Sequence, residues 1–373
     1  MPLNKKIGIL GGGQLGRMFI ENALSYNVNV SILDPAANAP CQNIADHFTQ
    51  GSFKDFDTVV AFAKDADVVT IEIEHVNTDA LKALEEMGKT VIPSAFAIET
   101  IKDKGLQKTF YKENGIVSSE FVMIENKEDL KNHLDFLPAF QKARTEGYDG
   151  KGQFVLREPA DATAAWAEIG NRELIAEAFV PFIREVSVIG CRAENGDIKV
   201  WPMTENIHHE GILRYSLYPA HGFSAEKQAI AERYIEQIAT SLDYVGTITL
   251  ELFETEDNLI ANEVAPRVHN SGHWSIEGAV TSQFRNHMLA VTGQAITETE
   301  SKFPAVAMIN VISDEGPTSA AAGMSQTYVH SYGKEARPAR KLGHVTITAA
   351  DTDERDSKIS QLEGLIPAGV WSK

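Results

Sequence analysis

The sequence has little cysteine, a shortage of basic residues and no long apolar run. Cys41 and Cys191 stand at no motif spacing, so neither a disulfide framework nor a zinc site is supported. No apolar segment reaches membrane-spanning length, and the apolar stretch after Lys5 and Lys6 runs into glycines instead of continuing as a signal peptide. We therefore expect a soluble, cytoplasmic protein with no membrane partner.

The charge balance narrows the classes of partner. The chain has 34 basic and 52 acidic residues and a net charge of −18, whereas a general nucleic-acid binder needs a basic surface. We expect small-molecule substrates and no nucleic acid, with any anionic ligand held by a local basic cluster. The length of 373 residues indicates two or three domains.

The most informative stretch covers residues 245–273. Its apolar residues alternate like those of a strand, a turn follows at 256–258, and a second strand is predicted over 259–264. If the hairpin closes symmetrically about Asp257, Glu251 lies opposite Glu263, with Cβ atoms about 4.5–5.5 Å apart. Such a carboxylate pair suits Mg²⁺ or Mn²⁺. The alternative is two solvated glutamates on an open sheet face.

A dense set of functional groups follows the second strand: Arg267, His269, Asn270, Ser271 and His273. A plain connection between elements rarely carries so many, so this loop is a candidate catalytic segment. At this point the sequence resembles the ATP-grasp superfamily, in which paired metal carboxylates on neighbouring strands precede an Arg-bearing loop.

The N-terminal segment predicts an open parallel sheet with strands over 7–10, 28–33, 68–71 and 90–92 and helices over 15–24, 55–64 and 78–87. Glu72, Glu74 and His75 follow the third strand, where open α/β sheets bind ligands, although they also fit a polar loop. The glycine run 11–16, with Asp34 after the second strand, leaves dinucleotide binding as an alternative.

A helix over 98–114 leads to the next motif, which begins after residue 141. Lys142 and Lys151 flank three glycines in a loop that can close on phosphates, although it is not a Walker loop and also fits a flexible hairpin. Strands over 173–180 and 185–190 follow. Glu177, Phe179 and Val180 offer the carboxylate and main-chain groups that an adenine or ribose pocket needs.

The C-terminal half predicts helices over 225–242 and 276–291 and strands over 305–312 and 344–349. His208 and His209 are adjacent on a strand and point to opposite faces, so a metal site there has little support. Lys334, Arg337, Arg340 and Lys341 form the densest basic cluster. A phosphate site or a solvated basic face would explain it.

Taken in order, the motifs of the whole chain resemble those of the N5-carboxyaminoimidazole ribonucleotide synthetases. They are GGGQLGRM, VVTIEIEHV, KARTEGYDGKGQ, ENIHHEGILR, the 251–274 run and YGKEARPARKLGH. The resemblance implies an α/β, ATP-grasp architecture with α+β character in its ATP-binding part. It implies a Rossmann-like domain at 1–98, an ATP-grasp domain at 99–295 with a lid at about 117–183, and a small β-rich segment at 296–373. It also implies a homodimer and the ATP- and bicarbonate-dependent carboxylation of 5-aminoimidazole ribonucleotide through carboxyphosphate in purine biosynthesis.

The same resemblance implies roles for individual residues. Glu251 and Glu263 would hold Mg²⁺, and bicarbonate would lie beside Arg267, His269 and Asn270, with Asp149, Lys151 and His273 as further catalytic candidates. ATP would contact Lys104, Lys142, Glu146, Gly147, Tyr148, Asp149, Gly150, Lys151, Gly152, Glu177, Ala178, Phe179, Val180, Glu185, His208, Asn262 and Glu263. The ribonucleotide would contact Gln14, Leu15, Glu72, His75, Tyr148, Arg267, Ser271, Lys334, Arg340 and Lys341, and Lys334 and Arg340 would hold its phosphate.

Two positions depart from the family, since Lys104 replaces the usual arginine and His75 replaces a frequent asparagine. A lysine cannot grip phosphate with two parallel bonds as an arginine does. Three alternatives to the synthetase remain: a formate-dependent transformylase of the same fold, a nicotinamide-dependent dehydrogenase, and a catalytically silent nucleotide sensor. The dehydrogenase lacks an evident hydride-transfer partner, and the sensor leaves the opposed carboxylates unexplained.

Overall fold

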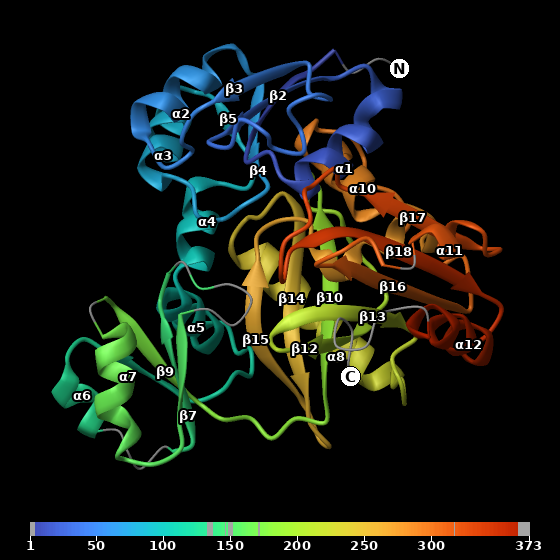
Figure 1. Cartoon of the computed structure of the whole chain (residues 1–373). Coiled ribbons are helices and arrows are strands. Elements are labelled where there is room, and N and C mark those ends of the chain that lie inside the picture. The colour runs from blue at the N-terminus through green and yellow to red at the C-terminus, as the bar shows by residue number, and fades with distance from the viewer. Residues whose placement is uncertain are drawn as a thin grey trace.

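The computed structural model describes residues 4–132, 137–145, 147, 152–170, 172–316 and 318–364. They form three β-sheets with helices packed around them (Figure 1). The α/β class and the open parallel sheet at the N-terminus are confirmed. Within these ranges, no helix is long and apolar enough to cross a bilayer.

The N-terminal sheet has the strand order β3-β2-β1-β4-β5, and every pairing in it is parallel. The sequence does not predict β3, because this short edge strand has no buried face to create an alternating pattern. The elements of this part are β1 (Lys6–Leu10), α1 (Gln14–Ala23), η1 (Leu24–Tyr26), β2 (Asn29–Asp34), β3 (His47–Gln50), α2 (Phe56–Phe62), η2 (Ala63–Asp65), β4 (Val68–Ile71), α3 (Thr78–Glu86) and β5 (Thr90–Val91).

The single helix predicted over 98–114 is wrong. The chain forms α4 (Ala95–Lys102) and α5 (Lys104–Glu113), separated by Asp103 in an extended conformation. The Asp103 carboxylate accepts hydrogen bonds from the backbone N–H groups of Gly105 and Leu106, so it caps a new helix instead of continuing the old one. Arg144 grips the same carboxylate through two nitrogens, at 2.7 and 2.9 Å.

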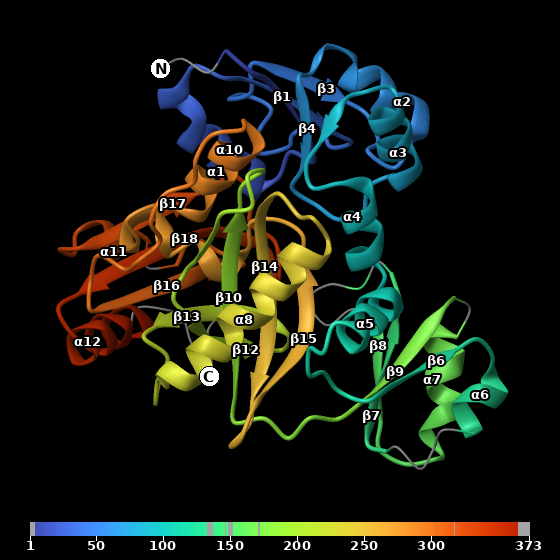
Figure 2. The same ribbon diagram turned by 180° about the vertical axis from the view of Figure 1, so that it is seen from behind.

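A small four-stranded sheet, in the order β6-β9-β7-β8, stands apart from the rest of the molecule (Figures 1 and 2). Helices α6 and α7 cover its outer face. Its elements are β6 (Phe121–Ile124), α6 (Lys127–Asn132), β7 (Ala139–Ala143), β8 (Gln153–Leu156), α7 (Asp161–Ile169) and β9 (Leu174–Ala178). The two strands predicted over 173–180 and 185–190 therefore belong to different sheets, since the second is part of β10.

The third sheet has nine strands in the order β15-β14-β10-β12-β13-β16-β18-β17, with β11 paired to β10. The C-terminal strands thus continue the same sheet. The strands are β10 (Arg184–Arg192), β11 (Ile198–Val200), β12 (Thr204–His209), β13 (Ile212–Tyr218), β14 (Gly246–Glu254), β15 (Leu259–Ala265), β16 (Ala305–Ile312), β17 (Thr327–Ser331) and β18 (Lys341–Ala349). The sequence analysis does not predict β17.

Helices flank this sheet, and α8 lies across its back in Figure 2. The helix predicted over 276–291 is wrong in one respect, because Ala279 is extended and bridges to Ser301, and Ser282 caps a second helix. The helices are α8 (Ala225–Ser241), η4 (Asn270–Gly272), α9 (Ser275–Gly278), α10 (Gln283–Val291), α11 (Thr318–Ala322) and α12 (Thr352–Glu363). Neither α11 nor α12 is predicted from the sequence.

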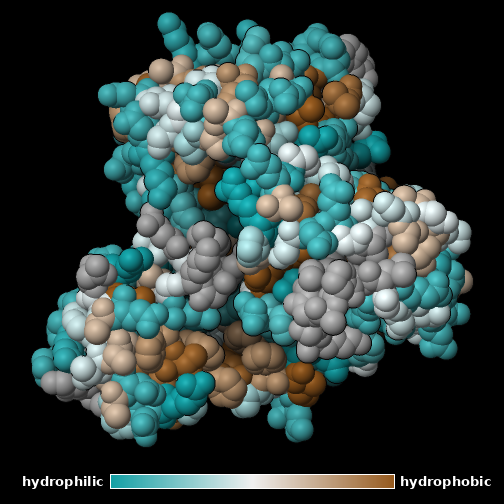
Figure 3. Space-filling model, in the orientation of Figure 1, coloured by the Kyte–Doolittle hydropathy of each residue, from teal (hydrophilic) through white to brown (hydrophobic). Residues whose placement is uncertain are grey.

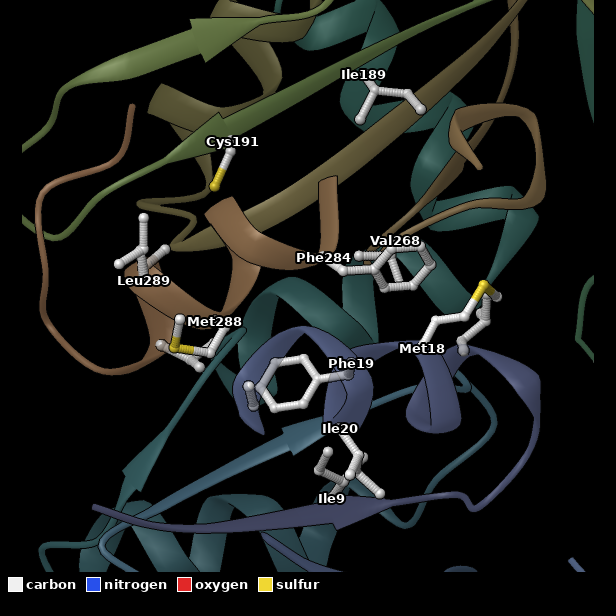
Figure 4. Close-up of a cluster of buried hydrophobic side chains, with 14 of the residues drawn as sticks. Ile9, Met18, Phe19, Ile20, Ile189, Cys191, Val268, Phe284, Met288 and Leu289 are labelled. Carbon is white, nitrogen blue, oxygen red and sulfur yellow. The ribbon is translucent and has the colours of Figure 1, made fainter. Parts of the chain in front are cut away.

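A shared core fixes the N-terminal sheet against the large one. Met18 and Phe19 of α1 and Phe284 and Met288 of α10 are all almost fully buried and belong to one cluster (Figure 4). Burying each such side chain contributes about 1.5–3 kcal/mol. The carboxyl ends of the parallel strands are therefore held in place over the loop that follows β15.

Candidate active site

The hairpin of β14 and β15 brings the two predicted carboxylates together. Glu251 is paired directly with Glu263, and Ser187 of β10 lies opposite Glu251 on the next strand. The symmetric closure about Asp257 is wrong, however, because the register shifts after Glu251 and Asn262 becomes an extra, bulged residue. A bulge re-aims neighbouring side chains, and this one lies beside the carboxylate pair.

The electrostatics of the pair favour a cation. Burial raises the pKa of Glu251 to about 7, and repulsion from Glu263 adds to the rise. On the other side, Lys104 Nζ lies 2.5 Å from a Glu263 oxygen and supplies one positive charge. Among the described residues, no group of three or more His, Cys, Asp and Glu side chains is placed to hold a metal ion. Two opposed carboxylates are a donor set that suits Mg²⁺, which takes one or two protein carboxylates and completes its shell with water and phosphate.

The loop after β15 folds back over this pair. His269 accepts or donates a hydrogen bond at Nδ1 with Ser271 Oγ, 2.9 Å away, and its Nε2 lies 3.4 Å from Glu251. Ser187 Oγ donates to Ser271 Oγ at 2.8 Å, which fastens the loop to the sheet. Burial and the nearby Arg267 lower the pKa of His269 to about 3, so the ring is neutral.

Arg267 is held by a residue from the N-terminal sheet. Its Nε and Nη2 lie 2.6 and 3.2 Å from the two oxygens of Glu74, which follows β4. Burial opposes ionisation of Glu74, but Arg267 outweighs it and lowers the pKa of the carboxyl to about 2. The sequence analysis notes Glu74 but assigns it no role. Its signal is the spacing from Glu72, which puts both carboxylates at one strand end.

Other polar groups of the loop are buried. Within the part of the chain that the structure describes, the side-chain nitrogen and oxygen of Asn270 have no hydrogen-bond partner, which leaves both for a ligand. His273 is fully buried beside Gln283, and burial lowers its pKa well below the usual value. His273 is therefore a neutral ring inside the protein, whereas Asn270 is the stronger candidate for direct contact.

A second group of predicted residues lines a pocket next to the carboxylate pair. Burial opposes ionisation of Glu177, but Lys142 and Lys108 outweigh it and lower the pKa of this carboxyl to about 2. The sequence analysis missed Lys108, because a lysine one helical turn after Lys104 gives no sign that it is buried. The pocket is lined by Lys104, Gln107, Lys108, Lys142, Glu177, Asn262 and Glu263.

Glu185 and His208 continue this site along the sheet. Glu185 Oε1 lies 3.1 Å from His208 Nδ1, and this carboxylate raises the pKa of His208 although burial opposes the rise. On the other side, Ala178 and Phe179 join the small sheet to β10. Phe179, Phe182 and Ile183 in and beside this linker are exposed. Figure 3 shows apolar patches along the bottom of the molecule.

The glycine loop before α1 is filled by protein carboxylates. Glu72 accepts from the N–H groups of Gly13 and Gly16, and Asp34 accepts from Gly12 at 2.7 Å. A Cβ atom at Gly13 would stand 2.7 Å from a Glu72 oxygen, so glycine makes room for that carboxylate. The amides that a dinucleotide phosphate would need are already bonded, and the dinucleotide alternative loses its physical basis.

The basic C-terminal cluster meets this loop. Lys334 Nζ donates to Gln14 Oε1 at the start of α1, which brings together residues 320 positions apart. Burial lowers the pKa of Lys334 to about 8. Arg340 Nη1 donates to the backbone oxygen of Glu335, and Lys341 begins β18.

The remaining predicted residues divide into two sets. Leu15 is buried in α1 and His75 follows Glu74, so both lie in the N-terminal part of the site. Gly152 has a φ of +73° and immediately precedes β8, beside Gly147. Glu146, Tyr148, Asp149, Gly150 and Lys151 lie outside the described residues.

Comparisons with known proteins match this arrangement in order along the chain. Residues 4–102 match the ribonucleotide synthetase preATP-grasp domain, 109–284 the ATP-grasp domain, and 306–358 the phosphoribosylaminoimidazole carboxylase C-terminal domain. The N5-carboxyaminoimidazole ribonucleotide synthase of Pseudomonas aeruginosa is 39% identical over 97% of this chain and 100% of its own length. The chain belongs to the N5-carboxyaminoimidazole ribonucleotide synthase family. It is an ATP-grasp enzyme, an ATP-dependent ligase, as the sequence predicts.

Solved structures of N5-carboxyaminoimidazole ribonucleotide synthases have the same fold. The Thermus thermophilus enzyme has a TM-score of 0.91 and 38% identity and covers 98% of this chain and 100% of its own. The Aspergillus clavatus enzyme, solved with ADP and 5-aminoimidazole ribonucleotide, has a TM-score of 0.90 and 31% identity, covering 98% and 99%. The predicted ATP-grasp architecture is confirmed, whereas the domain boundaries at 98 and 295 stay predictions.

Proposed function

We propose that this site carboxylates 5-aminoimidazole ribonucleotide with ATP and bicarbonate, in purine biosynthesis. The observation that carries the proposal is the convergence of three groups: the Glu251–Glu263 pair, the Arg267 loop held by Glu74, and the lysine pocket around Glu177. The carboxylate pair and the Arg267 loop are neighbours in the chain, whereas Glu74 comes from the N-terminal part and Glu177 from the small sheet. Together they provide sites for a metal, an anion and a nucleotide within one region of the molecule.

The first step is a phosphoryl transfer. A bicarbonate oxygen attacks the γ-phosphorus of ATP, ADP leaves, and carboxyphosphate forms. Such a transfer needs positioning and charge neutralisation more than covalent chemistry. Lys104, Lys142 and Arg267 supply positive charge, and Mg²⁺ held by Glu251 and Glu263 would neutralise part of the triphosphate. Bicarbonate would accept hydrogen bonds from Arg267 and from the Asn270 side chain.

The second step joins carbon to nitrogen. The exocyclic amine attacks the carboxyl carbon of carboxyphosphate, phosphate leaves, and the amine gives up a proton. The ribonucleotide would lie between the glycine loop and the basic cluster. Gln14, Glu72 and His75 would contact it from the N-terminal part, with Ser271, Lys334, Arg340 and Lys341 on the opposite side.

The nucleotide would occupy the pocket beside the small sheet. Glu177, Ala178, Phe179 and Val180 would contact its base and ribose, and Glu185, His208 and Asn262 would lie toward its phosphates. A cytoplasmic homodimer completes the proposal. Sedimentation of the purified protein measures the oligomeric state. A protein that is monomeric at all concentrations would contradict the proposed homodimer.

The decisive experiment measures ADP release with each substrate omitted in turn. We expect full turnover only with ATP, Mg²⁺, bicarbonate and the ribonucleotide together, and an acid-labile carbamate among the products. Formate in place of bicarbonate should not restore turnover. ADP release that depends on formate would instead indicate a transformylase. ADP release that is unchanged when the ribonucleotide is omitted would contradict the proposal that the ribonucleotide is the acceptor.

A further inference from the structure

Lys108 is a buried lysine with no role in the steps above. It lies on α5, one helical turn after Lys104, and is 1% exposed. Its ammonium group contacts three acceptors: Glu177 Oε2 at 3.0 Å, Ser119 Oγ at 3.0 Å and the backbone oxygen of Ala261 at 3.2 Å. Because an ammonium has three N–H donors, these contacts satisfy all of them.

Two of the three acceptors lie where the chain enters and leaves the small sheet, and the third lies on the large sheet. Ser119 precedes β6, where the chain enters the small sheet, and Glu177 is near the end of β9, where the chain leaves it. Ala261 belongs to β15, next to the bulged Asn262. Lys108 therefore touches the chain where it enters and where it leaves the small sheet, and it also touches the strand that carries Glu263.

Glu177 is shared between two lysines. Its Oε1 lies 3.2 Å from Lys142 Nζ, and its Oε2 accepts from Lys108 and, at 3.2 Å, from Ser119 Oγ. The Glu177 side chain is 5% exposed and that of Lys142 is 17% exposed, so the carboxylate has little access to water. A buried carboxylate that loses its only counter-ion is strongly disfavoured.

This sharing has a consequence for nucleotide binding. If Lys142 turns to a phosphate oxygen, its contact with Glu177 weakens, and Lys108 is the cation that remains on the carboxylate. Without Lys108, Lys142 would be the only cation on Glu177 among the described residues, and moving it would leave a buried negative charge unpaired. Nucleotide binding would then bear that cost.

We propose that Lys108 is a positioning residue of the nucleotide site, which holds the Glu177 carboxylate and so releases Lys142 to the nucleotide. The inference rests on the proposed placement of ATP in the lysine pocket. It does not depend on which acceptor is carboxylated. Lys108 itself touches Glu177, Ser119 and Ala261, and it acts on the nucleotide through Lys142.

The test combines Lys108→Met with Glu177→Gln. ADP affinity is measured by calorimetry with Mg²⁺ present, and KM values for ATP and the ribonucleotide are measured in the coupled assay. We expect Lys108→Met to weaken ADP binding and raise the KM for ATP at least tenfold, with the KM for the ribonucleotide changed less than twofold. Lys112→Met, an exposed lysine one turn further along α5, is the matched control and should change neither.

The double variant separates positioning from a general loss of structure. In the Glu177→Gln background there is no carboxylate to neutralise, so adding Lys108→Met should change ADP affinity less than twofold. An equal loss in both backgrounds, or no loss in the wild-type background, overturns the proposal. If Lys108→Met alone does not fold, the ADP affinities of Glu177→Gln and of the double variant still test the proposal. A loss of ADP affinity on adding Lys108→Met to Glu177→Gln would contradict the proposal, because no carboxylate is left for Lys108 to hold.

The two proposals fail in different ways. ADP binding requires no carboxylation, so the calorimetric pattern can hold while the wild-type enzyme proves to use another acceptor. Conversely, normal bicarbonate-dependent turnover together with additive effects of the two substitutions removes the role of Lys108 and leaves the reaction intact.

Discussion

A single substitution tests whether the carboxylate pair binds the metal. Glu263→Gln keeps the shape of the side chain but removes the charge that faces Glu251 and Lys104. We expect turnover to fall by about 10²–10³, because one preorganised electrostatic contact is lost. ADP release at saturating Mg²⁺ measures it, and an unchanged circular dichroism spectrum excludes unfolding. Turnover within threefold of the wild type would remove Glu263 from the metal site.

Lys334 gives the site a pH dependence. Burial lowers its pKa to about 8, so the free enzyme carries this charge below about pH 8 and loses it above. If Lys334 binds the phosphate, kcat/KM for the ribonucleotide should fall as the pH rises through 8, since this parameter reports the free enzyme. Lys334→Arg should keep its charge and show a flatter profile between pH 7 and 9.5. If the pH profiles of the wild type and Lys334→Arg are parallel, Lys334 does not bind the phosphate.

At the scale of elements, the contribution of Asp103, which separates α4 from α5, to the free energy of unfolding can be measured. Asp103→Ala removes the cap of α5 and the partner of Arg144 in one change. A helix cap contributes about 0.5–2 kcal/mol, and the partly exposed ion pair adds up to about 1 kcal/mol. We expect a loss of about 0.5–3 kcal/mol in the free energy of unfolding by urea. Asp103→Asn should retain most of the cap and lose less. Equal losses would mean that the cap contributes nothing.

The elements also show how far sequence patterns reach. Strands β4 and β16 have the predicted bounds, because a continuous apolar run or a clear alternation marks a buried strand. The pairing of Glu251 with Glu263 is confirmed, but the bulge at Asn262 is not predicted, since nothing local marks an extra residue. Lys108 is not predicted, and Glu74 is given no role, for a related reason. Their partners are distant in sequence, and only the folded chain shows that they are buried.

At the scale of the whole molecule, the ion pair of Glu74 and Arg267 joins two domains. Glu74→Gln leaves the Arg267 guanidinium without its carboxylate in a largely buried position, which costs about 3 kcal/mol. The folded-state pKa of Glu74, about 2, lies below its ordinary value of 4.5, so its contribution is fully present above pH 4.5 and is lost as the pH falls toward 2. Urea denaturation at pH 7 and pH 3 should therefore show a smaller difference between variant and wild type at the lower pH. A difference that grows on acidification would contradict the assignment.

The nine-stranded sheet has a consequence for synthesis on the ribosome. Strand β13 has β12 on one side, but its other neighbour, β16, emerges about ninety residues later. Until then β13 presents an open edge with free backbone N–H and C=O groups, which can recruit strands from other nascent chains. The second half of the sheet is complete only after β18 has been made. A premature stop near residue 300 should therefore yield aggregated protein and no shorter active enzyme.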